Sequence, residues 1–208
     1  MNIQGAKTSA LTLLIVQLIA LAVVLASHQA YSQVTFERLL NSAKEPQNWL
    51  TYSGDYSGQR HSGLDQINAT NVSSVVSKWV LQTAATGKLE TSPLVADGIL
   101  YATAQDDRAF ALDARSGRPI WFYQRQLPAD IRPCCGRVNR GLAILGDKVY
   151  LGTLDAHLIA LDAKTGIPLW KYTSGERYFS SPAVVNGMLY VATVDWEGHI
   201  YAFHLPEQ

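Results

Sequence analysis

Between residue 90 and the C-terminus, short apolar segments alternate with turn residues. Three pairs of segments are joined by Gly beside Asp or Asn, which strongly favours a two-residue β-hairpin turn. A further apolar segment follows each hairpin, and no stretch after residue 40 keeps a helical period. The turns are Asp97-Gly98, Gly146-Asp147 and Asn186-Gly187, and the following segments are 109–113, 158–162 and 200–203. The pattern predicts groups of antiparallel strands.

An 11-residue motif occurs twice, ending at Trp121 and at Trp170, 49 residues apart (170 − 121). Both copies read Ala-Leu-Asp-Ala, basic, hydroxyl, Gly, any residue, Pro, aliphatic, Trp. The hydroxyl-Gly pair predicts a turn into a fourth, outer strand that ends in Trp. Four antiparallel strands repeated every ~40–50 residues are typical of a β-propeller blade. A β-sandwich also has many short strands, but it does not predict the repeated motif. The predicted fold class is therefore all-β, with propeller blades of four antiparallel strands.

The third copy of the repeat, at 182–193, is followed by one more strand but by no turn and no Trp strand. Residues 78–83 precede the first copy and resemble an isolated Trp strand. Closed propellers have about four to eight blades, and this chain supplies three. We therefore expect an open arc of about three blades, with an exposed edge strand at its end.

The N-terminus has the form of a signal peptide, with basic Lys7, an uncharged apolar run at 11–26, and small residues Ala30 and Ser32 before a cleavage point. Export to the periplasm is the prediction. An uncleaved membrane anchor is the alternative, although the run is short for a ~20-residue span. The predicted organisation is a signal peptide at 1–32, an extended segment at 33–78 and propeller repeats at 79–208.

The charges of the chain are balanced. It has 17 basic and 17 acidic residues, so no nucleic-acid partner is predicted.

The two cysteines of the chain, Cys134 and Cys135, are adjacent. Neighbouring Cα atoms lie ~3.8 Å apart, below the usual disulfide range of ~4.4–6.8 Å, so a bond between them strains the backbone. Export favours the bonded form, and two reduced thiols are the alternative.

Several stretches together resemble the pyrroloquinoline-quinone (PQQ)-dependent alcohol dehydrogenases. They are Trp-Leu-Thr-Tyr-Ser-Gly-Asp-Tyr-Ser-Gly-Gln-Arg at 49–60, Leu-Asp-Gln-Ile-Asn at 64–68, Glu-Thr-Ser-Pro-Leu-Val at 90–95, Cys-Cys-x-x-Val-Asn-Arg-Gly at 134–141 and the repeated Trp motif. The resemblance runs over about residues 49–170. The adjacent-cysteine stretch is the most specific part, because other propellers share the Trp motif.

The resemblance implies an eight-bladed propeller with PQQ on its axis, a calcium or lanthanide ion beside the quinone, and oxidation of primary alcohols to aldehydes. Glu90 matches a residue that contacts the PQQ edge, and Arg140 matches one that pairs with a PQQ carboxylate. Cys134 and Cys135 match a disulfide that packs on the face of the ring. A guanidinium is a good partner for a carboxylate. The alternatives are a solvated strand residue for Glu90 and a surface charge for Arg140.

The metal ligands and the catalytic base of that family come from later blades and are not found in this sequence. A strand would place Asp195, Glu197 and His199 on one face, but a polar loop explains them better. We therefore expect a shortened quinoprotein that binds PQQ without independent dehydrogenase activity. The alternatives are a non-catalytic periplasmic scaffold and a subunit whose propeller another protein completes. Substrate and electron acceptor are not predicted.

Overall fold

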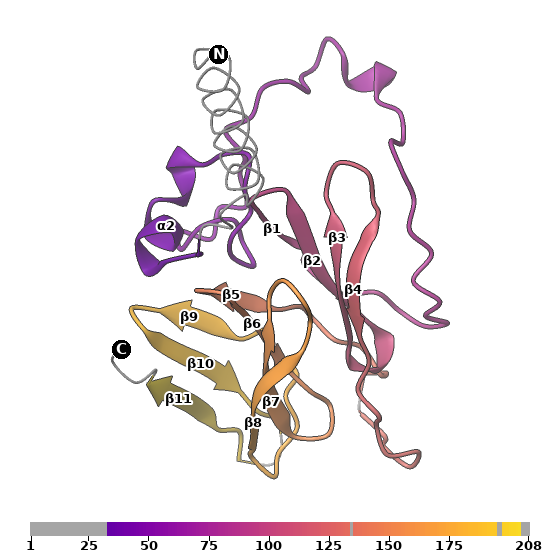
Figure 1. Ribbon diagram of the computed structural model, residues 1–208, viewed down its shortest axis with the longest axis vertical. Coiled ribbons are helices and arrows are strands. Elements are labelled where there is room, and N and C mark those ends of the chain that lie inside the picture. The colour runs from indigo at the N-terminus through magenta and orange to yellow at the C-terminus, as the bar shows by residue number, and fades with distance from the viewer. Residues whose placement is uncertain (1–32, 134, 195–196, 205–208) are drawn as a thin grey trace, which may run out of the picture. The chain divides into compact units, whose positions relative to one another are not determined.

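The computed structural model describes residues 33–133, 135–194 and 197–204 (Figure 1). The chain divides into two units, 1–32 and 33–208, and the first lies wholly outside the described residues. The predicted signal peptide therefore stays a prediction, as does the disulfide, because Cys134 is also outside. Within the described ranges, no helix is long and apolar enough to cross a membrane.

The second unit contains three antiparallel sheets (Figure 1). The first sheet contains β1 (Leu94–Ala96), β2 (Ile99–Ala104), β3 (Arg108–Asp113) and β4 (Pro119–Tyr123). The second sheet contains β5 (Ala143–Leu145), β6 (Lys148–Gly152), β7 (His157–Asp162) and β8 (Pro168–Thr173). The third sheet contains β9 (Ala183–Val185), β10 (Met188–Ala192) and β11 (Ile200–His204). Strands follow one another in sequence order across each sheet, and none of the three closes on itself. The predicted all-β, open fold is confirmed.

The register of the strands is the same in every sheet. A tyrosine of the second strand lies opposite an alanine of the third strand in all three cases, namely Tyr101 and Ala111, Tyr150 and Ala160, and Tyr190 and Ala202. In the two four-stranded sheets that alanine also lies opposite the motif Trp. The repeats read from the sequence are therefore repeats of geometry as well.

All three predicted turns join consecutive strands, although at Gly146-Asp147, between β5 and β6, only Gly146 has a positive φ, of 63°. Asp97 and Gly98 have φ of 50° and 81°, and Asn186 and Gly187 have φ of 47° and 74°. Two successive residues with positive φ form the type I′ turn that the Asp-Gly and Asn-Gly sequences favour. These turns join β1 to β2 and β9 to β10.

The structure corrects two details of the predicted outer strands. Trp121 and Trp170 lie in the middle of β4 and β8 rather than at their ends. Residues 78–83 form no strand, because they lie against the face of the first sheet instead of extending a sheet edge. Trp79 Nε1 donates a hydrogen bond to Ala114 O at 3.1 Å, and Trp121 Nε1 makes the same contact with Ala163 O at 2.9 Å in the second sheet.

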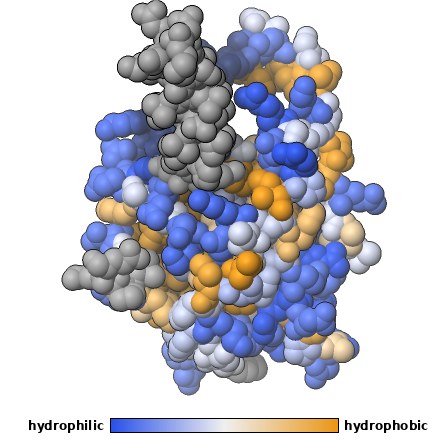
Figure 2. Space-filling model, viewed as in Figure 1, coloured by the Kyte–Doolittle hydropathy of each residue, from blue (hydrophilic) through white to orange (hydrophobic). Residues whose placement is uncertain are grey.

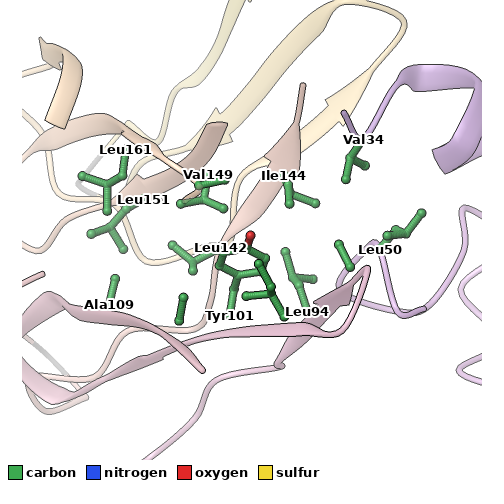
Figure 3. Packing of buried hydrophobic residues seen from close by; sticks show 14 of the residues in the cluster. Val34, Leu50, Leu94, Tyr101, Ala109, Leu142, Ile144, Val149, Leu151 and Leu161 are labelled. Carbon is green, nitrogen blue, oxygen red and sulfur yellow. The ribbon is translucent and has the colours of Figure 1, made fainter. Parts of the chain in front are cut away.

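The main core lies between the first and second sheets (Figure 3). Leu94, Tyr101 and Ala109 of the first sheet pack against Val149 and Leu151 of the second. A smaller cluster joins the second sheet to the third through Leu158, Val184 and Leu189, among others. On the face drawn in Figure 2, hydrophobic residues form only small groups between hydrophilic ones. Apolar burial between neighbouring sheets is thus the main stabilising contact of the unit.

The segment before the first sheet begins with a short helix, α2 (Phe36–Leu40), and contains 3₁₀ turns at Ser42–Lys44 and Val72–Ser74. Backbone bridges join Val34 to Gly146 and Trp49 to Val95, so residues 34–49 are tied to the hairpins of the first two sheets. A third 3₁₀ turn, Gln105–Asp107, connects β2 to β3.

Candidate functional site

The candidate site lies where the inner strands β1, β5 and β9 begin. Ser92, two residues before β1, forms a parallel backbone bridge with Gly141, two residues before β5. The hydroxyl of Ser181, two residues before β9, donates to Arg140 O at 2.8 Å. Equivalent positions of the three repeats therefore meet at one place, although they are far apart in sequence.

Glu90 and Arg140 are brought together at this place. Arg140 Nη2 lies 3.2 Å from Glu90 Oε2, and Arg140 Nη1 donates to Phe179 O at 2.9 Å. About a third of each charged side chain is exposed, 31% for Arg140 and 34% for Glu90. The sequence predicted that both residues contact a cofactor, but it did not predict that they pair with each other.

A buried polar network, which the sequence analysis missed, fixes the backbone on both sides of Arg140. Asn139 Nδ2 donates to Asp107 Oδ1 and to Gly152 O, both at 2.8 Å, and Asn139 Oδ1 accepts from Gly141 N–H at 3.1 Å. Asp107 Oδ2 accepts from Leu154 N–H at 2.7 Å. The network therefore links the β2–β3 connection, the Arg140 loop and the second sheet.

Asp107 is fully buried, and burial raises the pKa of its carboxyl to about 6, although hydrogen bonds from Asn139 and Leu154 oppose the shift. An acid with a raised pKa often marks a functional site, but here a structural role accounts for it. The available signal was Asn139 itself, which stands inside the Cys-Cys-x-x-Val-Asn-Arg-Gly stretch. The partner Asp107 carries no comparable sequence signal.

The cysteine loop is attached to the same connection between β2 and β3. The guanidinium of Arg137 pairs with the carboxylate of Asp106, and Asp106 N–H donates to Arg137 O at 2.9 Å. Cys135 is exposed in this loop. The loop is therefore anchored to the connection that also carries Asp107.

A cavity of about 390 Å³ opens beside Arg140. Its walls are Tyr52, Arg140 and residues 179–183. Tyr52 comes from the family-like stretch 49–60, and its ring lies 5.3 Å from the guanidinium carbon of Arg60. The lining is mainly apolar and includes the rings of Tyr52 and Phe179, while Arg140 adds a guanidinium, a set that suits a planar anionic ligand.

The third sheet does not supply a metal centre in the part of the chain that the structure describes, where no group of three or more His, Cys, Asp or Glu side chains converges. His199 Nδ1 lies 2.9 Å from Glu176 Oε2, which also accepts from the hydroxyl of Thr193 at 2.7 Å. Of the three residues that a strand would have placed on one face, Asp195 lies outside the described residues, while Glu197 and His199 lie within them. The contacts of Glu176 with His199 and Thr193 thus stabilise the loop after β10.

A sequence model of the PQQ family, described as glucose/ethanol/alcohol dehydrogenase, β-propeller domain, matches residues 49–178. The chain belongs to this family. The matched range includes Glu90, Cys134, Cys135 and Arg140. The predicted resemblance is therefore confirmed.

Curated relatives and solved structures agree. The chain is 48% identical to the 1-butanol dehydrogenase (quinone) of Thauera butanivorans over 129 residues, which cover 61% of this chain and 21% of that protein. It is 36% identical to the quinoprotein alcohol dehydrogenase PedH of Pseudomonas putida over 197 residues, which cover 89% of this chain and 33% of that protein. The quinohemoprotein alcohol dehydrogenase ADHIIG from Pseudomonas putida HK5 superposes on 81% of this chain and 26% of its own, with a TM-score of 0.75 and 35% identity. A europium-containing methanol dehydrogenase gives the same TM-score at 33% identity, over 81% of this chain and 32% of its own. The chain thus spans about a fifth to a third of the length of these curated relatives.

Proposed function

We propose that this chain binds PQQ at the start of the inner strands, through Glu90, Cys134, Cys135 and Arg140, as part of a quinoprotein alcohol dehydrogenase-type propeller. The observation that supports the proposal most is Arg140, which lines a cavity of about 390 Å³ and stands between two anchored neighbours, Asn139 and Gly141. An arginine whose backbone is fixed on both sides loses little freedom when it binds a ligand, and this favours tight binding.

Arg140 has the hydrogen-bonding capacity for this role. Its guanidinium has five N–H donors, and contacts with Phe179 and Glu90 take up one each among the described residues. A carboxylate of PQQ accepts a forked pair of hydrogen bonds from the other donors. Glu90, whose ionised carboxylate accepts hydrogen bonds and donates none, holds the guanidinium in place.

The chemistry follows from the cofactor and not from the propeller. Bound PQQ would supply the two-electron acceptor for oxidation of a primary alcohol to an aldehyde, as in the quinoprotein relatives. The residues that the structure describes do not fit a calcium or lanthanide ion, since they form no cluster of acidic or imidazole ligands. PQQ binding without independent dehydrogenase activity is therefore the proposed role of this chain. The predicted signal peptide supports a periplasmic location for this function.

A calorimetric titration of the oxidised protein with PQQ tests the proposal. The wild-type chain should bind one equivalent, and Arg140→Ala should bind about 30-fold more weakly, because a forked hydrogen bond to an anion is worth ~2 kcal/mol. Arg115→Ala is the matched control, since Arg115 is an exposed arginine in the β3–β4 turn. Absence of binding to the wild type, or equal losses in both variants, would refute the proposed site.

A further inference from the structure

A second cavity adjoins the one that Arg140 lines. Its volume is about 370 Å³, and its walls are Trp49, Tyr52, Arg60, Ser92, Pro93 and Val95. The side chain of Tyr52 belongs to the walls of both cavities. Ser92 connects them as well, because its N–H donates a hydrogen bond to Arg140 O at 3.4 Å. The two cavities are therefore neighbours, and each of them has one arginine in its wall.

The charge of Arg60 is not offset by a carboxylate. Arg125 and Arg137 each pair with an aspartate, whereas Arg60 makes no side-chain hydrogen bond or ion pair in the part of the chain that the structure describes. Arg140, by contrast, already pairs with Glu90. Among the described residues that line the two cavities, none is acidic. Arg60 therefore supplies the net positive charge at this place.

The backbone and an aromatic ring together hold the Arg60 side chain in place. Its φ is 54°, a left-handed conformation that is uncommon for a residue other than glycine. Its guanidinium carbon lies 5.3 Å from the centre of the Tyr52 ring, at the distance of an attractive cation–π contact. Strained conformations of this kind persist where the surrounding structure holds them, and they cluster at sites that clamp a ligand. The guanidinium is thus kept beside the ring that the two cavities share.

We propose that Arg60 binds a second carboxylate of the cofactor, so that two arginines in adjoining cavities hold one planar polycarboxylate. The inference rests on the proposed function, because it concerns the same ligand. PQQ is a planar tricarboxylate, and a guanidinium suits each carboxylate that it meets. The two guanidiniums and the carboxylate of Glu90 leave a single net positive charge for this anion. A ligand with only one carboxylate engages one arginine at a time, so the pair selects for ligands with several carboxylates.

Calorimetric titration of the oxidised full chain with PQQ at low and high salt tests this role. Arg60→Ala should bind PQQ about fivefold more weakly than the wild type, because Arg60 is exposed and an exposed ion pair contributes little. Screening should reduce this difference to less than about twofold in 1 M NaCl. Arg60→Gly removes the same side chain and suits the positive φ, so it should lose the same affinity without backbone strain. Arg115→Ala, at an exposed arginine in the β3–β4 turn, is the matched control and should bind as the wild type does.

The trimethyl ester of PQQ separates pairing with carboxylates from stacking on the ring. It has no carboxylate, so the wild type and Arg60→Ala should bind it equally. Equal affinity of the wild type and both Arg60 variants for PQQ, or a fivefold loss that the ester shows as well, would overturn the inference and leave the proposed function standing. Absence of PQQ binding to the wild type would refute the proposed function, and the inference with it.

Discussion

Replacement of Asn139 by Ala should destabilise the protein by about 4 kcal/mol at pH 7, although Asn139 lies in a loop. Its side chain makes three hydrogen bonds in the interior, to Asp107 Oδ1, Gly152 O and Gly141 N–H. Loss of a hydrogen bond to a charged group costs about 1.5–3 kcal/mol, and loss of each of the other two costs about 1 kcal/mol. The groups left behind are buried, so water cannot replace the missing partner.

The loss should depend on pH through Asp107. Because burial raises the pKa of Asp107 from 3.8 to about 6, the folded state holds this proton more tightly than the unfolded chain does. Asp107 therefore favours folding below about pH 4, and this contribution of about 3 kcal/mol is lost as the pH rises through 6. Asn139→Ala removes a bond that favours the charged carboxylate, so its cost should be about 1 kcal/mol smaller at pH 5 than at pH 8.

Urea unfolding followed by tryptophan fluorescence at pH 5 and pH 8 measures both effects. Asn41→Ala is the control, because it removes a solvent-exposed hydrogen bond to Glu37 O and should cost less than about 1 kcal/mol. A loss below about 1 kcal/mol for Asn139→Ala at pH 8, or a larger loss at pH 5 than at pH 8, would refute the role assigned to the network.

Three further substitutions have effects on stability that the structure predicts. Gly117→Ala should cost about 2 kcal/mol more than Gly98→Ala in urea unfolding, because both glycines have positive φ but only a Cβ at 117 would lie 2.5 Å from the ring of Trp79; equal costs would contradict this packing. Arg38→Gln should cost about 1 kcal/mol at low salt and less in 1 M NaCl, because Arg38 pairs with Glu45 and Asp97 near the surface; a loss independent of salt would argue against an ionic role. Asp107→Asn removes the carboxyl that titrates, so the stability of the variant should no longer fall between pH 4 and pH 6. The variant should also leave one donor, from Asn139 or Leu154, facing an amide N–H. A pH profile equal to that of the wild type would assign the titration to another group.

The sequence predicted the repeated parts of the fold well because they depend on local signals. Asp97-Gly98 and Asn186-Gly187 need only their own φ angles to form hairpins, and the alternation of apolar residues then fixes the register. The repeated motif places a Trp in each outer strand, and Trp121 of the first sheet packs against Gly166 of the second.

Contacts between segments that are distant in the sequence could not be predicted from it. The pairing of Asn139 with Asp107 joins residues 32 positions apart, and neither belongs to a regular strand. The contact between Glu90 and Arg140 likewise depends on how the inner strands meet. Residues 78–83 were expected to form a strand because they resemble β4 and β8, but strand pairing requires a neighbouring edge as well as a pattern.

A crystal structure of the oxidised full chain with PQQ would show where the cofactor binds. We expect a PQQ carboxylate within hydrogen-bond distance of the Arg140 guanidinium, with the ring beside Cys135 and Tyr52. PQQ bound elsewhere on the chain, or a cavity beside Arg140 that stays free of PQQ at saturating concentration, would contradict it.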